Sequence, residues 1–127
     1  MHKGSCLCGA VQFELHGDLR PSVACHCSQC RKTSGHYWSA TQVSNDKLVL
    51  TRDDGLKWFR SSETTRRGFC GQCGASLFWE VDGTGETSVG TGTLDGATGL
   101  QTERHIFVAD KGDYYTIADG CPQLDKW

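Results

Sequence analysis

The segment Cys25-His26-Cys27-Ser28-Gln29-Cys30 carries three of the eight cysteines of the chain. Two closely spaced pairs flank it in the sequence, Cys6-Leu7-Cys8 and Cys70-Gly71-Gln72-Cys73. Thiols at these spacings are typical of metal ligands, and a disulfide across Cys6-Leu7-Cys8 would close a strained ring. The N-terminal residues also lack the apolar core of a secretory signal, which favours a reducing compartment, where disulfides are rare. We therefore expect two metal sites, with two zinc ions per chain.

The two flanking pairs supply four thiolates, from Cys6, Cys8, Cys70 and Cys73. Four thiolates complete the tetrahedral coordination of zinc and leave no position for a substrate, so we predict a structural zinc here. Glycines follow both pairs, and their positive φ angles would let backbone N–H groups turn toward the sulfurs. The competing metal is iron, alone or in an iron–sulfur cluster.

The central segment offers three thiolates, from Cys25, Cys27 and Cys30. In an extended stretch Cys25 and Cys27 point to the same side, and a helical turn from Ser28 would bring Cys30 back toward them. Three ligands leave one tetrahedral position open, which is typical of a catalytic zinc. The alternative is a second closed site, completed by Cys121 or a histidine. We expect Cys121 to be a buried apolar group, and His26, which points away from its neighbours, to pack or hydrogen-bond behind the site.

Basic and aromatic side chains near these cysteines are candidates for substrate binding. Arg31 directly follows the third cysteine of the central segment, and Arg66 precedes the last pair. A guanidinium binds carboxylates in a bidentate manner, and Trp38 could form an apolar wall. The alternative interpretation is that each arginine is a solvated surface charge and that the tryptophan ring packs in the hydrophobic core.

The pattern of apolar residues predicts a mainly β fold. Val11, Phe13 and Leu15 alternate with polar residues, which indicates a half-buried strand. Further strands are expected over 36–43, 47–51, 56–59, 76–81, 87–94, 104–109 and 114–117. The second and third of these ranges surround Asp53-Asp54-Gly55, which predicts a hairpin. One short helical turn is expected over 28–33, and the class is a single domain of short antiparallel strands.

The length and charge of the chain limit the classes of protein to which it can belong. A chain of 127 residues is one domain, residues 1–127, and only 37% of the residues are apolar, so metal crosslinks would help to stabilise it. The formal net charge is −2, which gives no support for binding nucleic acid. No apolar run approaches the length of a membrane span. We expect a cytoplasmic protein with no membrane or nucleic-acid partner.

Three cysteine motifs and the C-terminal tail together resemble the glutathione-dependent formaldehyde-activating enzyme family. They lie in residues 4–11, 25–35 and 67–74 and in the tail segments 105–108 and 119–122, so the resemblance runs from about residue 4 to residue 122. The resemblance implies a β-rich, tent-like fold with two zinc ions. It places the structural ion on Cys6, Cys8, Cys70 and Cys73, and the catalytic ion on the central three cysteines.

The resemblance also implies an activity, the joining of formaldehyde to glutathione as S-(hydroxymethyl)glutathione, which in reverse is a carbon–sulfur lyase reaction. Its substrates would be a small thiol such as glutathione and an aldehyde. Fold and metal sites transfer within a family more safely than substrates do. The alternative function is therefore a non-catalytic zinc module that binds a thiol ligand or a protein partner.

Overall fold

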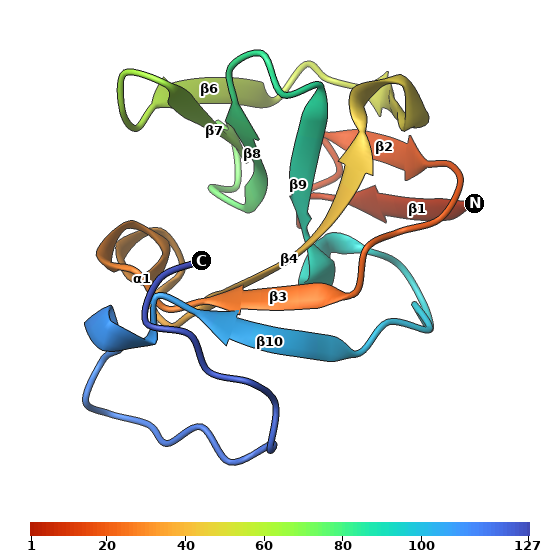
Figure 1. Ribbon diagram of the computed structural model, residues 1–127. Helices are drawn as coiled ribbons and strands as arrows, with labels where there is room; N and C mark the ends of the chain where they lie inside the picture. The colour runs from red at the N-terminus through yellow and green to blue at the C-terminus, as the bar shows by residue number, and fades with distance from the viewer.

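The computed structural model describes all residues, 1–127, and is built mainly of short strands with a single α-helix (Figure 1). The strands are β1 (His2–Ser5), β2 (Gln12–Leu15), β3 (Ser22–Cys25), β4 (Trp38–Ser44), β5 (Leu48–Arg52), β6 (Leu56–Arg60), β7 (Thr65–Cys70), β8 (Ser76–Val81), β9 (Glu86–Gly90) and β10 (Thr102–Ile106). The helices are α1 (Ser28–Ser34) and the three 3₁₀ turns η1 (Asn45–Lys47), η2 (Thr91–Thr93) and η3 (Val108–Asp110). None of these helices is both long and apolar enough to cross a membrane.

The strands form two sheets. The smaller has the order β1-β2-β5, and the larger has the order β10-β3-β4-β9-β8-β7-β6. Every pair is antiparallel except β10 with β3, which is parallel. The larger sheet bends strongly, so that β6, β7 and β8 stand above β3 and β10, with α1 and the C-terminus on the open side (Figure 1). The expected class, mainly β with short antiparallel strands, is confirmed.

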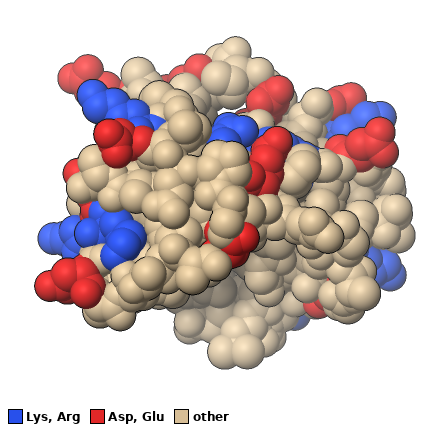
Figure 2. Space-filling view, turned by 60° about the horizontal axis from the view of Figure 1, so that its bottom comes forward, with Lys and Arg blue, Asp and Glu red and all other residues tan.

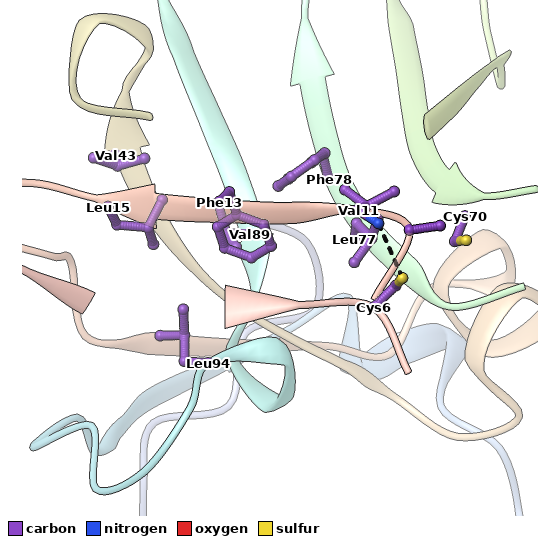
Figure 3. Close-up of a cluster of buried hydrophobic side chains, with 11 residues drawn as sticks. Cys6, Val11, Phe13, Leu15, Val43, Cys70, Leu77, Phe78, Val89 and Leu94 are labelled. Carbon is purple, nitrogen blue, oxygen red and sulfur yellow. Dashed lines mark hydrogen bonds between the residues drawn. The ribbon is translucent and has the colours of Figure 1, made fainter. Parts of the chain in front are cut away.

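The hydrophobic core lies between the smaller sheet and one face of the larger sheet. Phe13 and Leu15 of β2 are at most 1% exposed, as their alternation with polar residues predicts. Phe13 packs edge-on against Phe78 of β8, with ring centroids 5.2 Å apart. Cys6 and Cys70 lie at one end of this cluster beside Val11 (Figure 3).

Most of the expected strands are present, with shifted ends. The predicted range 76–81 is β8. The range 47–51 differs from β5 by one residue at each end, and 56–59 differs from β6 by one residue at its C-terminal end. The strand predicted over 87–94 is shorter in the structure, because the chain turns into η2 after β9. The helical turn predicted over 28–33 is α1.

Two expectations are wrong. The strands β5 and β6 do not pair as a hairpin, because β5 pairs with β2 in the smaller sheet and β6 pairs with β7 in the larger one. A turn does form, since the Leu56 N–H donates to the Asp53 carbonyl at 3.0 Å, but it carries the chain from one sheet to the other. Residues 114–117 are not a strand, and the aromatic ring of Tyr115 packs against histidine rings instead.

Charged residues of both signs are mixed on the face shown in Figure 2. Lys and Arg side chains stand beside Asp and Glu side chains, and uncharged residues cover much of the area between them (Figure 2). This face therefore has no broad field of a single sign.

Candidate metal centre and cleft

Four sulfurs come together where the first turn of the chain meets the end of β7. The Sγ atoms of Cys6, Cys8, Cys70 and Cys73 all lie within 4.8 Å of one another. Cys8 Sγ lies 3.7 Å from both Cys6 Sγ and Cys70 Sγ, which is too long for a disulfide. A tetrahedron with Zn–S bonds of 2.3 Å has edges of about 3.8 Å, so this four-cysteine cluster fits a zinc ion.

Backbone N–H groups surround the sulfurs of the four-cysteine cluster. The Val11 N–H donates to Cys6 Sγ at 3.3 Å (Figure 3), and the Gln72 and Cys73 N–H groups donate to Cys70 Sγ at 3.4 and 3.5 Å. Gly74 has a φ of 80°, a conformation that favours glycine, and its N–H closes the turn on the Cys70 carbonyl. Such N–H donors stabilise thiolates and hold the ligands in place.

A second group of three sulfurs, the three-cysteine cluster, forms where β3 meets α1. Cys25 ends β3, Cys27 is the N-cap of α1, and Cys30 lies in its first turn, with its N–H donating to Cys27 Sγ at 3.4 Å. The three Sγ atoms lie within 4.8 Å of one another, so the donor set fits a soft divalent ion such as zinc. Hydrogen bonds from Cys25 and Cys30 lower the pKa of Cys27, whereas the hydrogen bond to Cys27 raises the pKa of Cys25, so Cys27 carries the negative charge first.

No further protein ligand joins the three-cysteine cluster. Cys121 lies elsewhere, with its Sγ 3.3 Å from the Thr102 carbonyl, and it is half-buried where the sequence suggested full burial. His26 points to the opposite face of the sheet, as expected from its place between two cysteines of an extended stretch. The cluster therefore offers three protein sulfurs to a metal ion.

His26 is fully buried in a hydrogen-bonded chain behind the cysteines. Its Nδ1 bonds to the Tyr115 hydroxyl, and its Nε2 lies 2.9 Å from His105 Nδ1. His105 Nε2 in turn lies 2.8 Å from an Asp119 carboxylate oxygen. Burial lowers the pKa of His26 to about 4, so the ring is neutral near pH 7. The chain ties the segment after β10 to the backbone that carries Cys25.

A cleft of about 560 Å³ lies against the face of the larger sheet opposite the core, and all three residues of the three-cysteine cluster line it. The four-cysteine cluster does not line the cleft. Strand pairing puts Trp38, Cys25 and Ile106 side by side in one row of this face, and Ala40, Val23 and Arg104 in the next. The three-cysteine cluster thus opens onto a space large enough for a small molecule.

The three predicted substrate-binding residues lie in different places. Trp38 lines the cleft, whereas Arg31 and Arg66 do not. Arg66 stacks over Trp58 at 3.7 Å and binds Glu80 at 2.7 Å.

Arg67, the next residue along β7, does line the cleft. Its Nη2 lies 3.5 Å from Cys30 Sγ and 3.4 Å from Gln29 Oε1, and its Nε has no hydrogen-bond partner. Successive residues of a strand face opposite sides, so only one of the two arginines can reach the cleft. Arg67 pairs across the sheet with Trp79, which also lines the cleft, and this pairing shows which of the two arginines faces the cleft. The sequence alone does not reveal the pairing.

The family model of the glutathione-dependent formaldehyde-activating enzyme matches residues 1–110. The chain belongs to this family. An "Uncharacterized lyase" of Schizosaccharomyces pombe is 23% identical over 119 residues, which cover 93% of this chain and 86% of the relative. A protein of Halomonas elongata named "Putative glutathione-dependent formaldehyde-activating enzyme" is 34% identical, covering 63% of this chain and 55% of the relative. A protein of the same name from Pyrenophora teres f. teres is 33% identical, but the match covers only 38% of its length.

A solved structure has the same fold. The crystal structure of a Rhodobacter sphaeroides protein superimposes with a TM-score of 0.62 at 27% identity, covering 76% of this chain and 91% of that chain. The membership of the family thus rests on sequence over most of the chain, and the fold has an experimental counterpart.

Proposed function

We propose that this protein is a zinc-dependent carbon–sulfur lyase that forms and cleaves the adduct of a small thiol with an aldehyde, such as S-(hydroxymethyl)glutathione. The observation that carries the proposal is the three-cysteine cluster, which lines a cleft of about 560 Å³ while the four-cysteine cluster does not. The family match and the lyase name of one relative support the same class of reaction.

The reaction needs a thiolate and a means of stabilising an oxyanion. In the synthetic direction the sulfur bonds to the aldehyde carbon, the C=O π electrons move to oxygen, and that oxygen takes a proton from water. The lyase direction reverses these steps. Cys25, Cys27 and Cys30 would hold a zinc ion, which would lower the pKa of a thiol bound to it.

The side chains of the cleft supply binding and orientation. Arg67 lies beside Cys30, where its positive charge stabilises thiolate sulfur and also attracts the oxyanion that develops on the substrate. Trp38 and Trp79 present apolar rings to the same space, which shields the reacting sulfur from water. We assign the contact with substrate to Arg67 and Trp38, in preference to Arg31 and Arg66, because only the former pair lines the cleft.

The test is the rate at which glutathione and labelled formaldehyde exchange with their adduct, measured by magnetisation-transfer NMR with the zinc-loaded protein. We expect the wild type to raise the exchange rate above the uncatalysed background, and Cys27→Ser to abolish that increase. Arg67→Met should reduce it by about tenfold or more, because a charged donor at the site is lost. Arg66→Met is the matched control, since it removes the same charge from the other face of β7.

An exchange rate equal to the background would overturn the proposal. Thiol binding without an increase in rate would favour the alternative, a non-catalytic zinc module that binds a thiol ligand. Equal losses in Arg67→Met and Arg66→Met would show that net charge, and not the position of Arg67, affects the rate.

A further inference from the structure

The face of the larger sheet that lines the cleft is organised in rows. Cys25, at the end of β3, pairs with Ile106 of β10, and Val23 pairs with Arg104 in the next row. Side chains two residues apart on a strand are separated by about 7 Å. Arg104 therefore lies one row away from the three-cysteine cluster, on the same face.

A second arginine reaches the same end of the cleft. Arg20 precedes β3, and its Nη2 donates to the Ala40 carbonyl at 2.8 Å, with Nη1 3.4 Å from Gln42 Oε1. Ala40 is the cross-strand neighbour of Val23, so the guanidinium of Arg20 is anchored beside the row that holds Arg104. Both arginines line the cleft.

The positive charges of these two arginines are only partly offset. Burial, followed by the positive charge of Arg104, lowers the pKa of Arg20. Arg104 contacts Glu103 at 3.3 Å through Nη1, while its Nε is enclosed and has no hydrogen-bond partner. Glu86 also attracts Arg20, but neither glutamate lines the cleft. Asp110, the last residue of η3 after β10, is the acidic residue that does line the cleft.

We propose that Arg104 and Arg20 form a subsite for a carboxylate of the ligand whose sulfur binds at the three-cysteine cluster. Two like charges beside one cavity repel each other, and an anion bound between the two guanidinium groups relieves that repulsion. The subsite lies about one row spacing, about 7 Å, from the cysteines. This inference rests on the proposed function: the ligand is a thiol that carries an anionic group at that distance.

The test compares two thiols that differ only at the far end. The affinities of zinc-loaded protein for ω-mercaptohexanoate and ω-mercaptohexanol are measured by calorimetry. We expect the wild type to bind the carboxylate about tenfold more tightly than the alcohol. This ratio corresponds to the low end of the free energies of hydrogen bonds to charged groups, as suits a partly open site. Arg104→Gln and Arg20→Gln should each reduce that preference to about twofold or less. The affinity for the alcohol and the zinc content should stay unchanged.

Arg60→Gln is the matched control, because Arg60 pairs with Asp82 at the surface and does not line the cleft. It should keep the full preference for the carboxylate. A preference that survives in both Arg104→Gln and Arg20→Gln, or that falls equally in Arg60→Gln, overturns the subsite.

A second measurement separates this inference from the proposed function. The arginine Nε–H signals are followed by NMR during titration with hexanoate and with hexanol, neither of which has a thiol. A shift of the Arg104 signal with hexanoate alone supports the subsite even if no thiol binds, and the absence of any shift overturns it. Failure of both thiols to bind, with the hexanoate shift present, would count against the proposed function only.

Discussion

The two cysteine clusters should contribute unequally to stability. In the four-cysteine cluster, Cys8 and Cys70 are 62 residues apart in sequence, whereas the three-cysteine cluster joins residues only five apart. A cross-link that closes a loop of 62 residues removes chain entropy worth about 4 kcal/mol, and one that closes a loop of five residues removes about 2 kcal/mol. The difference of about 2 kcal/mol is a large part of the stability of a small domain.

The perturbation is a pair of matched double variants, Cys70→Ser/Cys73→Ser and Cys27→Ser/Cys30→Ser, each of which removes two thiolates from one cluster. We expect the first to lose about 4 kcal/mol of unfolding free energy and the second about 2 kcal/mol. Each variant loses one zinc cross-link, and the two cross-links close loops of different length. Cys70 is also fully buried in the core, so burial of a hydroxyl adds to the cost of the first variant.

The assay is urea unfolding followed by circular dichroism, with zinc counted by elemental analysis. With a typical urea dependence, a gap of about 2 kcal/mol separates the two midpoints by roughly 1 M. If the zinc cross-links cause the difference in stability, the gap between the two midpoints should shrink after both variants are treated with a strong chelator. Equal midpoints in the zinc-loaded proteins, or a lower midpoint for Cys27→Ser/Cys30→Ser, would refute the reasoning.

Three further predictions concern metal removal and packing. A mild chelator should remove one zinc per chain quickly, from the three-cysteine cluster at the open cleft, and the other slowly. Release is followed with a colorimetric zinc indicator, and simultaneous release of both ions would contradict the division between the sites. Gly55→Ala should cost about 1–3 kcal/mol in urea unfolding, since its methyl would lie 2.7 Å from the Ala10 side chain, whereas Gly92→Ala, in open space, should be neutral or slightly stabilising. Tyr115→Phe should cost about 1–3 kcal/mol by leaving the buried Nδ1 of His26 unpaired, with zinc content unchanged, and an unaltered melting temperature would count against that hydrogen bond.

Local patterns in the sequence predicted the parts of the fold that depend on neighbouring residues. The strand β8, Ser76–Val81, follows from an apolar and aromatic run that ends at Asp82-Gly83. The strand β7, Thr65–Cys70, was missed, because Arg66, Arg67 and Gly68 give no alternation of apolar and polar residues. It is held in the sheet by its partners β6 and β8 on either side, which no short window of sequence can reveal.

The same distinction explains what could be predicted of the site. The spacing of Cys25, Cys27 and Cys30 is local, and a strand followed by a helical turn is enough to bring their sulfurs together. The cleft depends on the bend of the larger sheet, which brings Arg67 of β7 and Arg104 of β10 to the same cavity from opposite halves of the sheet. Residues that meet only through a bent sheet have no signature in the sequence. For that reason the sequence did not reveal Arg104, and it gave no ground for choosing Arg67 over its neighbour Arg66.

The core determines which side chains face the cleft. Phe78 of β8 packs in the core against Phe13, and its neighbour Trp79 therefore faces the cleft, in the same cross-strand row as Arg67 and Ser88. A shift of one residue in the register of β8 would exchange the two faces of the whole strand. It would place an indole in the core and a phenyl ring beside the three-cysteine cluster. The buried contacts of Phe78 thus fix the composition of the cleft, and the bend of the sheet then brings that face around the cysteines.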